Sequence, residues 1–164
     1  MNYRVKWIGL MIVLTLVAAQ AAAQVLTADE LKKAVPASFF FAGQSATVQM
    51  RNSVGLKNSA GKIMIAGLVD TSGYATSIVE KFQGFLITEA RISVGGSSLE
   101  PGAYGFGISK EGKFNVMNMA GTEALSVPTT ADEKRAHPVP LKLEKDGSAY
   151  RLYAGKKYVV VKAD

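Results

Sequence analysis

The chain has 164 residues, a net charge of +6, no cysteine and a single histidine, His137. The lack of cysteine excludes disulfides, thiolate metal sites and cysteine nucleophiles. Zinc favours cysteine and histidine ligands, and the chain has only one histidine, so we expect no metal site. We also expect no cofactor. The mild positive charge favours solubility, and we expect no dedicated nucleic-acid groove.

Residues 1–23 have the three parts of a secretory signal peptide. Arg4 and Lys6 give a positive start, Ile8–Ala19 is an uncharged apolar run, and Ala21–Ala23 is a small-residue cleavage site. The apolar run is short of the roughly 20 residues that a spanning helix needs. We therefore predict export to the periplasm or the medium, with no membrane-embedded part once the signal is removed.

Removal of this signal would leave residues 24–164 as a single domain with a net charge of +4, because two basic residues leave with it. A chain of this size buries roughly two-thirds of its surface on folding. It can therefore fold by packing alone, without disulfides.

The mature chain begins with a predicted short helix. Thr27 and Glu30 have the spacing of a capping box, and Pro36 is expected to end the helix. The three aromatic residues of Phe39–Phe41 follow. In an extended segment their rings lie on both faces, so at least one face is expected to pack against this helix or another chain.

The remaining pattern is mainly that of β-strands with turn residues between them. Glu111-Gly112 and Asp146-Gly147 predict hairpins, and residues 75–82 favour a helix over the start of a strand. We expect an all-β sandwich or barrel of roughly seven to ten strands with a short N-terminal helix. The expected strands are residues 46–52, 62–69, 84–94, 102–109, 113–119, 140–145, 148–154 and 157–162.

The segment Pro128–Pro140 interrupts the strands with three prolines and several charges, and we interpret it as a long exposed loop. His137 lies in this loop. No neighbour in sequence would fix its imidazole, so we assign it no catalytic role.

The segment Leu68–Thr71 comes closest to a catalytic motif. It resembles the active-site loop of aspartic peptidases of the pepsin and retropepsin type, in which two aspartates share a proton. The chain departs from that pattern because Ser72 replaces the glycine and Gly73 comes one position late. The resemblance implies a dimeric peptidase using Asp70; the alternative is that Asp70 bonds the amides of its own turn.

The segment from Gly102 to Ile108 alternates aromatic or aliphatic residues with glycine. Such a bare strand face marks close approach by another group. One interpretation is that a neighbouring side chain, Val116 or Phe114, covers it; the other is a ligand groove. For the groove we name five candidate ligand-binding residues: Tyr104, Gly105, Phe106, Gly107 and Asn118.

Basic residues are interleaved with tyrosines along the last three predicted strands, a pattern shared by single-strand nucleic-acid sites and by solvated sheet faces. They are Lys142, Lys145, Arg151, Lys156, Lys157 and Lys162, with Tyr150, Tyr153 and Tyr158. We favour the solvated face. Our main hypothesis is a non-catalytic binding or structural module with an unidentified partner. Its contact surface would include residues 102–119 and the Pro128–Pro140 loop. The alternative is the Asp70 peptidase.

Overall fold

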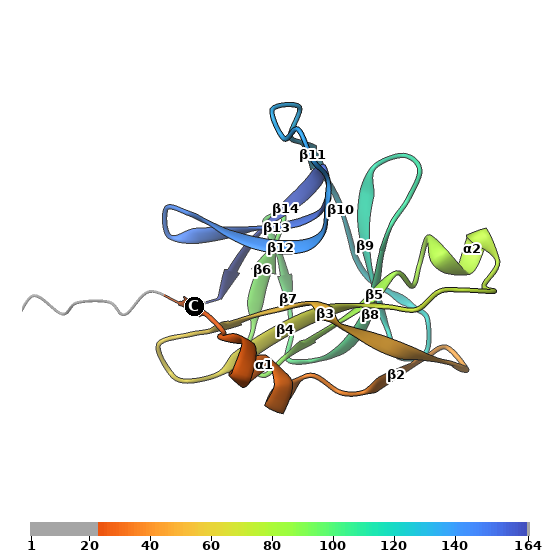
Figure 1. Ribbon diagram of the computed structural model, residues 1–164, viewed down its shortest axis with the longest axis horizontal. Helices are drawn as coiled ribbons and strands as arrows, with labels where there is room; N and C mark the ends of the chain where they lie inside the picture. The colour runs from red at the N-terminus through yellow and green to blue at the C-terminus, as the bar shows by residue number, and fades with distance from the viewer. Residues whose placement is uncertain (1–22, 164) are drawn as a thin grey trace, which may run out of the picture.

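The computed structural model describes residues 23–163, and the predicted signal peptide lies almost wholly outside them. Two β-sheets pack face to face, and a third layer of one short helix and one strand covers the far side of the larger sheet (Figure 1). Neither sheet closes on itself. The fold is therefore the predicted all-β type, in its sandwich form. No helix within residues 23–163 is long and apolar enough to cross a bilayer.

The larger sheet is antiparallel throughout, and β2 (Ser38–Phe41) extends it by pairing with β3. The other strands follow in spatial order: β1 (Gln24–Val25), β3 (Gln44–Lys57), β4 (Ile63–Val69), β5 (Gly84–Thr88), β8 (Gly102–Ile108), β9 (Lys113–Asn118) and β10 (Glu123–Pro128).

The smaller sheet is built mainly from the C-terminal strands, and β11 (Thr130–Ala131) is added to it by pairing with β14. Its other strands follow in spatial order: β12 (Val139–Asp146), β13 (Ala149–Gly155), β14 (Lys157–Ala163), β6 (Ile92–Val94) and β7 (Ser97–Leu99). Residues 23–163 form fourteen strands, of which ten have four or more residues. The excess over the expected seven to ten comes from four strands of two or three residues, one of which, β6, lies within the predicted strand 84–94.

The main core fills the space between the two sheets. A second core lies on the opposite face of the larger sheet, where helix α1 (Ala28–Ala34) and β2 pack. β4 faces both cores: Met64 and Ala66 point into the first, Ile65 and Val69 into the second. A strand that is buried on both faces has a continuous apolar sequence, which is what this segment shows.

Helix α1, in the third layer, forms as the sequence predicts. Thr27 and Glu30 make both bonds of the capping box, and the helix ends before Pro36. Phe39 and Phe41 of β2 point into the second core and stack on Phe85 and Phe82, whereas Phe40 is 56% exposed. The second helix, α2 (Thr76–Val79), is a single turn within residues 75–82, the segment whose sequence favours a helix.

Both predicted hairpins are present. β8 and β9 are joined through Gly112, and β12 and β13 through Gly147; each glycine has a positive φ. The predicted strand 84–94 is instead two strands, β5 and β6, which belong to different sheets. The chain crosses between the sheets at residues 89–91, although polar and apolar residues continue to alternate through this segment.

Candidate functional site: a cleft at the open end of the sandwich

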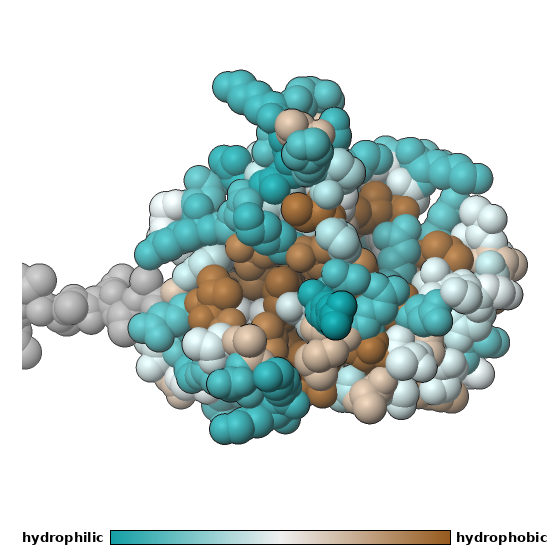
Figure 2. Space-filling model, viewed as in Figure 1, coloured by the Kyte–Doolittle hydropathy of each residue, from teal (hydrophilic) through white to brown (hydrophobic). Residues whose placement is uncertain are grey.

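A cleft of about 560 Å³ opens at one end of the sandwich, where β4, β8 and β13 end and β12 and β14 begin. Its apolar wall includes Leu68, Ile108 and Ala154, three partly buried residues that pack against the main core. The cleft is thus the point at which the main core reaches the surface. Figure 2 shows hydrophobic residues between the smaller sheet, at the top of the view, and the larger sheet below, along the side of the sandwich that faces the viewer.

Side-chain size along β13 explains why the sandwich opens at this end. Its inward-facing residues are Tyr150, Leu152 and Ala154, so they become smaller toward the cleft. At the other end Tyr150 is 3% exposed, and its hydroxyl donates to the carbonyl oxygen of Ala23. Because facing sheets lie about 10 Å apart, a small residue such as alanine leaves a gap that nothing else on its strand fills.

On the larger sheet, the pairing of β3 with β4 is interrupted at this end. β3 and β4 pair at Val48↔Val69 and again at Ser53↔Gly67, with residues 49–52 of β3 out of register between them. Gln49 lies in this bulge, lines the cleft and donates through Nε2 to the carbonyl oxygen of Val69. The bulge therefore places the Gln49 side-chain amide at the rim.

Three charged side chains line the cleft: Glu80, Lys110 and Lys157. The Lys110 ammonium lies 3.5 Å from the Glu80 carboxylate, so these two charges offset one another. Lys157 is half-buried, and its Nζ reaches toward the β8–β9 turn, 3.5 Å from where a Cβ on Gly112 would stand. No ion pair within residues 23–163 involves Lys157, so the cleft carries a net positive charge.

The Pro128–Pro140 segment borders the cleft and is more ordered than its composition predicts. Thr130 and Ala131 pair with β14, and the amide of Asp132 donates to the carbonyl oxygen of Lys156. These bonds fix the start of β14, where Lys157 lies. His137 is exposed in the rest of the segment.

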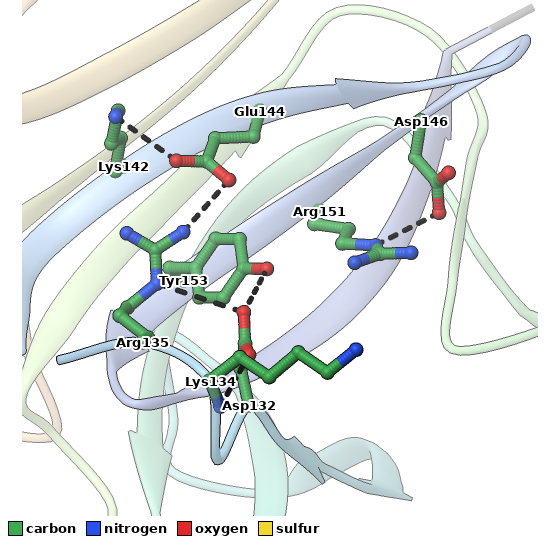
Figure 3. A network of polar contacts seen from close by, with 8 residues as sticks. All are labelled: Asp132, Lys134, Arg135, Lys142, Glu144, Asp146, Arg151 and Tyr153. Carbon is green, nitrogen blue, oxygen red and sulfur yellow. Dashed lines mark hydrogen bonds and ion pairs between the residues drawn. The ribbon is translucent and has the colours of Figure 1, made fainter.

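A polar network holds the same segment against the outer face of the smaller sheet (Figure 3). The Arg135 guanidinium lies 3.8 Å from the Tyr153 ring centroid and 2.7 Å from the Glu144 carboxylate. The Tyr153 hydroxyl donates to Asp132 at 2.9 Å. Bonds from Arg135 and then from Lys142 lower the pKa of Glu144 below its usual value.

The tyrosines of the last strands are engaged within the protein. Tyr153 is 1% exposed beneath Arg135, Tyr150 faces the core, and Arg151 lies 4.9 Å from the Tyr158 ring centroid. The sequence pattern showed the rings and Arg151, but it could not show that Arg135 covers Tyr153, because Arg135 comes from a segment without strand pattern.

The five candidate ligand-binding residues on β8 and β9 do not line one groove. Phe106 faces the main core and is fully buried, whereas Gly105 and Gly107 face the opposite side of the sheet. Tyr104 donates to the carbonyl oxygen of Glu100, and the Asn118 side chain accepts from the amides of its own turn. Residues alternate between faces along a strand, so these side chains cannot meet on one surface.

The bare face of β8 is filled by the protein itself. A Cβ on Gly105 would stand 2.6 Å from the Phe41 ring, and one on Gly107 would stand 2.2 Å from the carbonyl oxygen of Glu80. The prediction that Val116 or Phe114 covers these glycines is wrong. Those residues pair with Phe106 and Ile108, so they share the opposite face.

Asp70 lies on an exposed turn directly after β4. Its carboxylate accepts from the Ser72 hydroxyl at 2.6 Å and from the Ser72 amide at 3.0 Å, and these bonds lower its pKa. This is the local arrangement that the sequence offered as the alternative to a catalytic loop. Within residues 23–163, no three aspartate, glutamate or histidine side chains are grouped so as to hold a metal ion.

Comparison with known proteins assigns no family: the chain matches no protein-family model, no curated protein and no solved structure.

Proposed function

We propose that this protein is an exported, non-catalytic binding module that holds a small ligand in the cleft at the open end of the sandwich. Export is the prediction made from residues 1–23. The contact surface includes part of the region expected from the sequence, namely the end of β8 and the Pro140 end of the long segment. The pattern of glycines does not contribute to it.

The observation that carries this proposal is that residues packed against the main core also line a cleft open to solvent. Protein sites for small ligands generally have volumes of about 300–1,000 Å³, apolar walls and a few polar groups that orient the ligand. The cleft has about 560 Å³, a wall that includes Leu68, Ile108 and Ala154, and a polar rim. A ligand would complete the main core at the point where the protein's own side chains stop.

A second hollow of about 330 Å³ lies beside Phe41, Ile78 and Gly121, on the other side of α2. It is outside the interface between the two sheets and does not continue the main core. We therefore assign ligand binding to the larger cleft.

The test is uptake of an uncharged apolar dye, N-phenylnaphthylamine, whose fluorescence rises in apolar sites. The wild-type protein is expected to bind it saturably, and Ala154→Leu is expected to weaken binding by filling the cleft. Ala163→Leu is the matched control. Ala163 is also partly buried against the main core, but it lies at the end of β14 that is far from the cleft. Equal binding by the Ala154→Leu protein, with the fold intact by circular dichroism, would refute the proposal.

A further inference from the structure

We propose that the ligand of the cleft is a free amphiphile with an anionic group, bound by Lys157, and an apolar body one chain or one ring thick. This inference rests on the proposed function and adds the chemical class of the ligand. It is carried by the position of Lys157, the charges around it and the shape of the cleft.

Lys157 belongs to the inward-facing row of β14. Val159 and Val161 of the same row are buried in the main core, and Lys157 is the member that reaches the cleft. It stands near Ala154 of β13, which shares the cleft wall. Lysine is rarely directed toward an interior unless an anion accompanies it. A ligand anion would supply that partner.

The surrounding charges favour an anion at this position. Glu80 is the one carboxylate among the cleft residues, and Lys110 already offsets it. The carbonyl oxygen of Gly112, in the turn near the Lys157 ammonium, already accepts from the amide and the hydroxyl of Thr129. The Lys157 ammonium therefore retains its capacity to bind an incoming carboxylate.

The shape of the cleft favours a thin apolar body. Facing sheets lie about 10 Å apart, and side chains from both occupy most of that distance. Ala154 is smaller than Tyr150 and Leu152, the other inward-facing residues of β13, and the space left beside it suits a single hydrocarbon chain or a flat ring. A free molecule fits better than a bilayer, because Lys157 is on the inner face of the smaller sheet, whereas Lys142 and Lys162 are exposed.

The experiment compares two probes of equal chain length, dodecanoate and dodecanol, as competitors of bound N-phenylnaphthylamine. In the wild-type protein, dodecanoate is expected to displace the dye at about a tenfold lower concentration, as a hydrogen bond to a charged group implies. Lys157→Met is expected to abolish that advantage, because methionine keeps the aliphatic stem without the charge, and Lys157→Arg is expected to retain it. Lys162→Met, on the same strand but exposed, is the matched control.

The outcomes separate the two proposals. If the dye binds in an Ala154-dependent way but dodecanoate has no advantage, or keeps its advantage in Lys157→Met, the anion site is wrong and the cleft stands. If the wild-type protein takes up no dye, both fail. Sedimentation with phosphatidylglycerol vesicles is the third arm: binding to vesicles that depends on Lys157, without binding of dodecanoate, would overturn the free amphiphile.

Discussion

The guanidinium of Arg135 lies 3.8 Å from the ring centroid of Tyr153, although the two residues come from different kinds of segment. Arg135 belongs to the proline-rich segment before β12, and Tyr153 lies within β13. Their contact, with Glu144 and Asp132 on either side, fixes that segment to the sheet and with it the edge of the cleft.

This contact predicts that Arg135→Ala destabilises the protein and frees the segment around it. Arg135→Lys should recover only part of the stability, since an ammonium cannot stack flat on a ring while it bonds a carboxylate. Tyr153→Phe keeps the ring and loses one hydrogen bond to Asp132, so it should lower the free energy of unfolding by about 1 kcal/mol. Urea unfolding, with hydrogen exchange of residues 130–137, measures both effects; unchanged exchange in Arg135→Ala would contradict the account.

The glycines of β8 predict two unequal substitutions. Gly107→Ala should destabilise the protein by about 3 kcal/mol or prevent folding, because its Cβ would overlap the backbone of Glu80. Gly105→Ala should cost about 1–2 kcal/mol, because the Phe41 ring that it meets is a side chain and can move. Thermal unfolding of the two variants tests the order, and a Gly107→Ala protein as stable as wild type would show that the backbone after α2 does not cover this strand.

Glu30 predicts a specific acid dependence of stability. The bond from Lys57, followed by those within the Thr27 cap, lowers its pKa from 4.5 to about 2. A carboxyl group whose pKa is lower in the folded protein stabilises the fold at pH values above its unfolded-state pKa. This contribution disappears as the pH falls from 4.5 toward 2. The difference in melting temperature between wild type and Glu30→Gln should therefore be largest near neutral pH and shrink across this interval.

Lys57→Met provides the check on that assignment. It removes the largest cause of the shift while leaving Glu30 and its cap in place, so the pH dependence of the Lys57→Met protein should be intermediate. A constant difference between wild type and Glu30→Gln from neutral pH to pH 2 would show that the Glu30–Lys57 contact does not stabilise α1 in solution.

The peptidase alternative predicts acid-dependent peptide cleavage that Asp70→Asn abolishes. The turn-capping arrangement predicts instead that neither protein cleaves peptides, and that Asp70→Asn and Ser72→Ala each lower the melting temperature slightly through the loss of local bonds. A peptide-library digest at acid and neutral pH, with both variants beside wild type, decides between the two.

The sequence predicted the local features well because their causes are local. The capping box at Thr27 and the turns at Gly112 and Gly147 depend on residues that are adjacent or three apart, and all three are in place. The double burial of β4 is likewise visible in its continuous apolar run.

The candidate site could not be predicted in the same way, because it depends on which strands lie opposite one another. The register of β8 on β9 placed Val116 and Phe114 on the face away from the glycines, and nothing within either segment specifies that face. The transfer of the chain between sheets after β5 likewise depends on packing. One sequence feature did point to the cleft. In β14, Lys157 occupies the same alternating series of positions as the buried Val159 and Val161.

The most direct test of the central claim is to locate a bound apolar ligand by methyl-resolved NMR. On titration with N-phenylnaphthylamine, the methyl signals of Leu68, Ile108 and Ala154 are expected to shift together and to show intermolecular contacts with the dye. Shifts confined to Ile78 and Ala120, which line the smaller hollow, or no saturable shifts in any of these residues, would contradict the account.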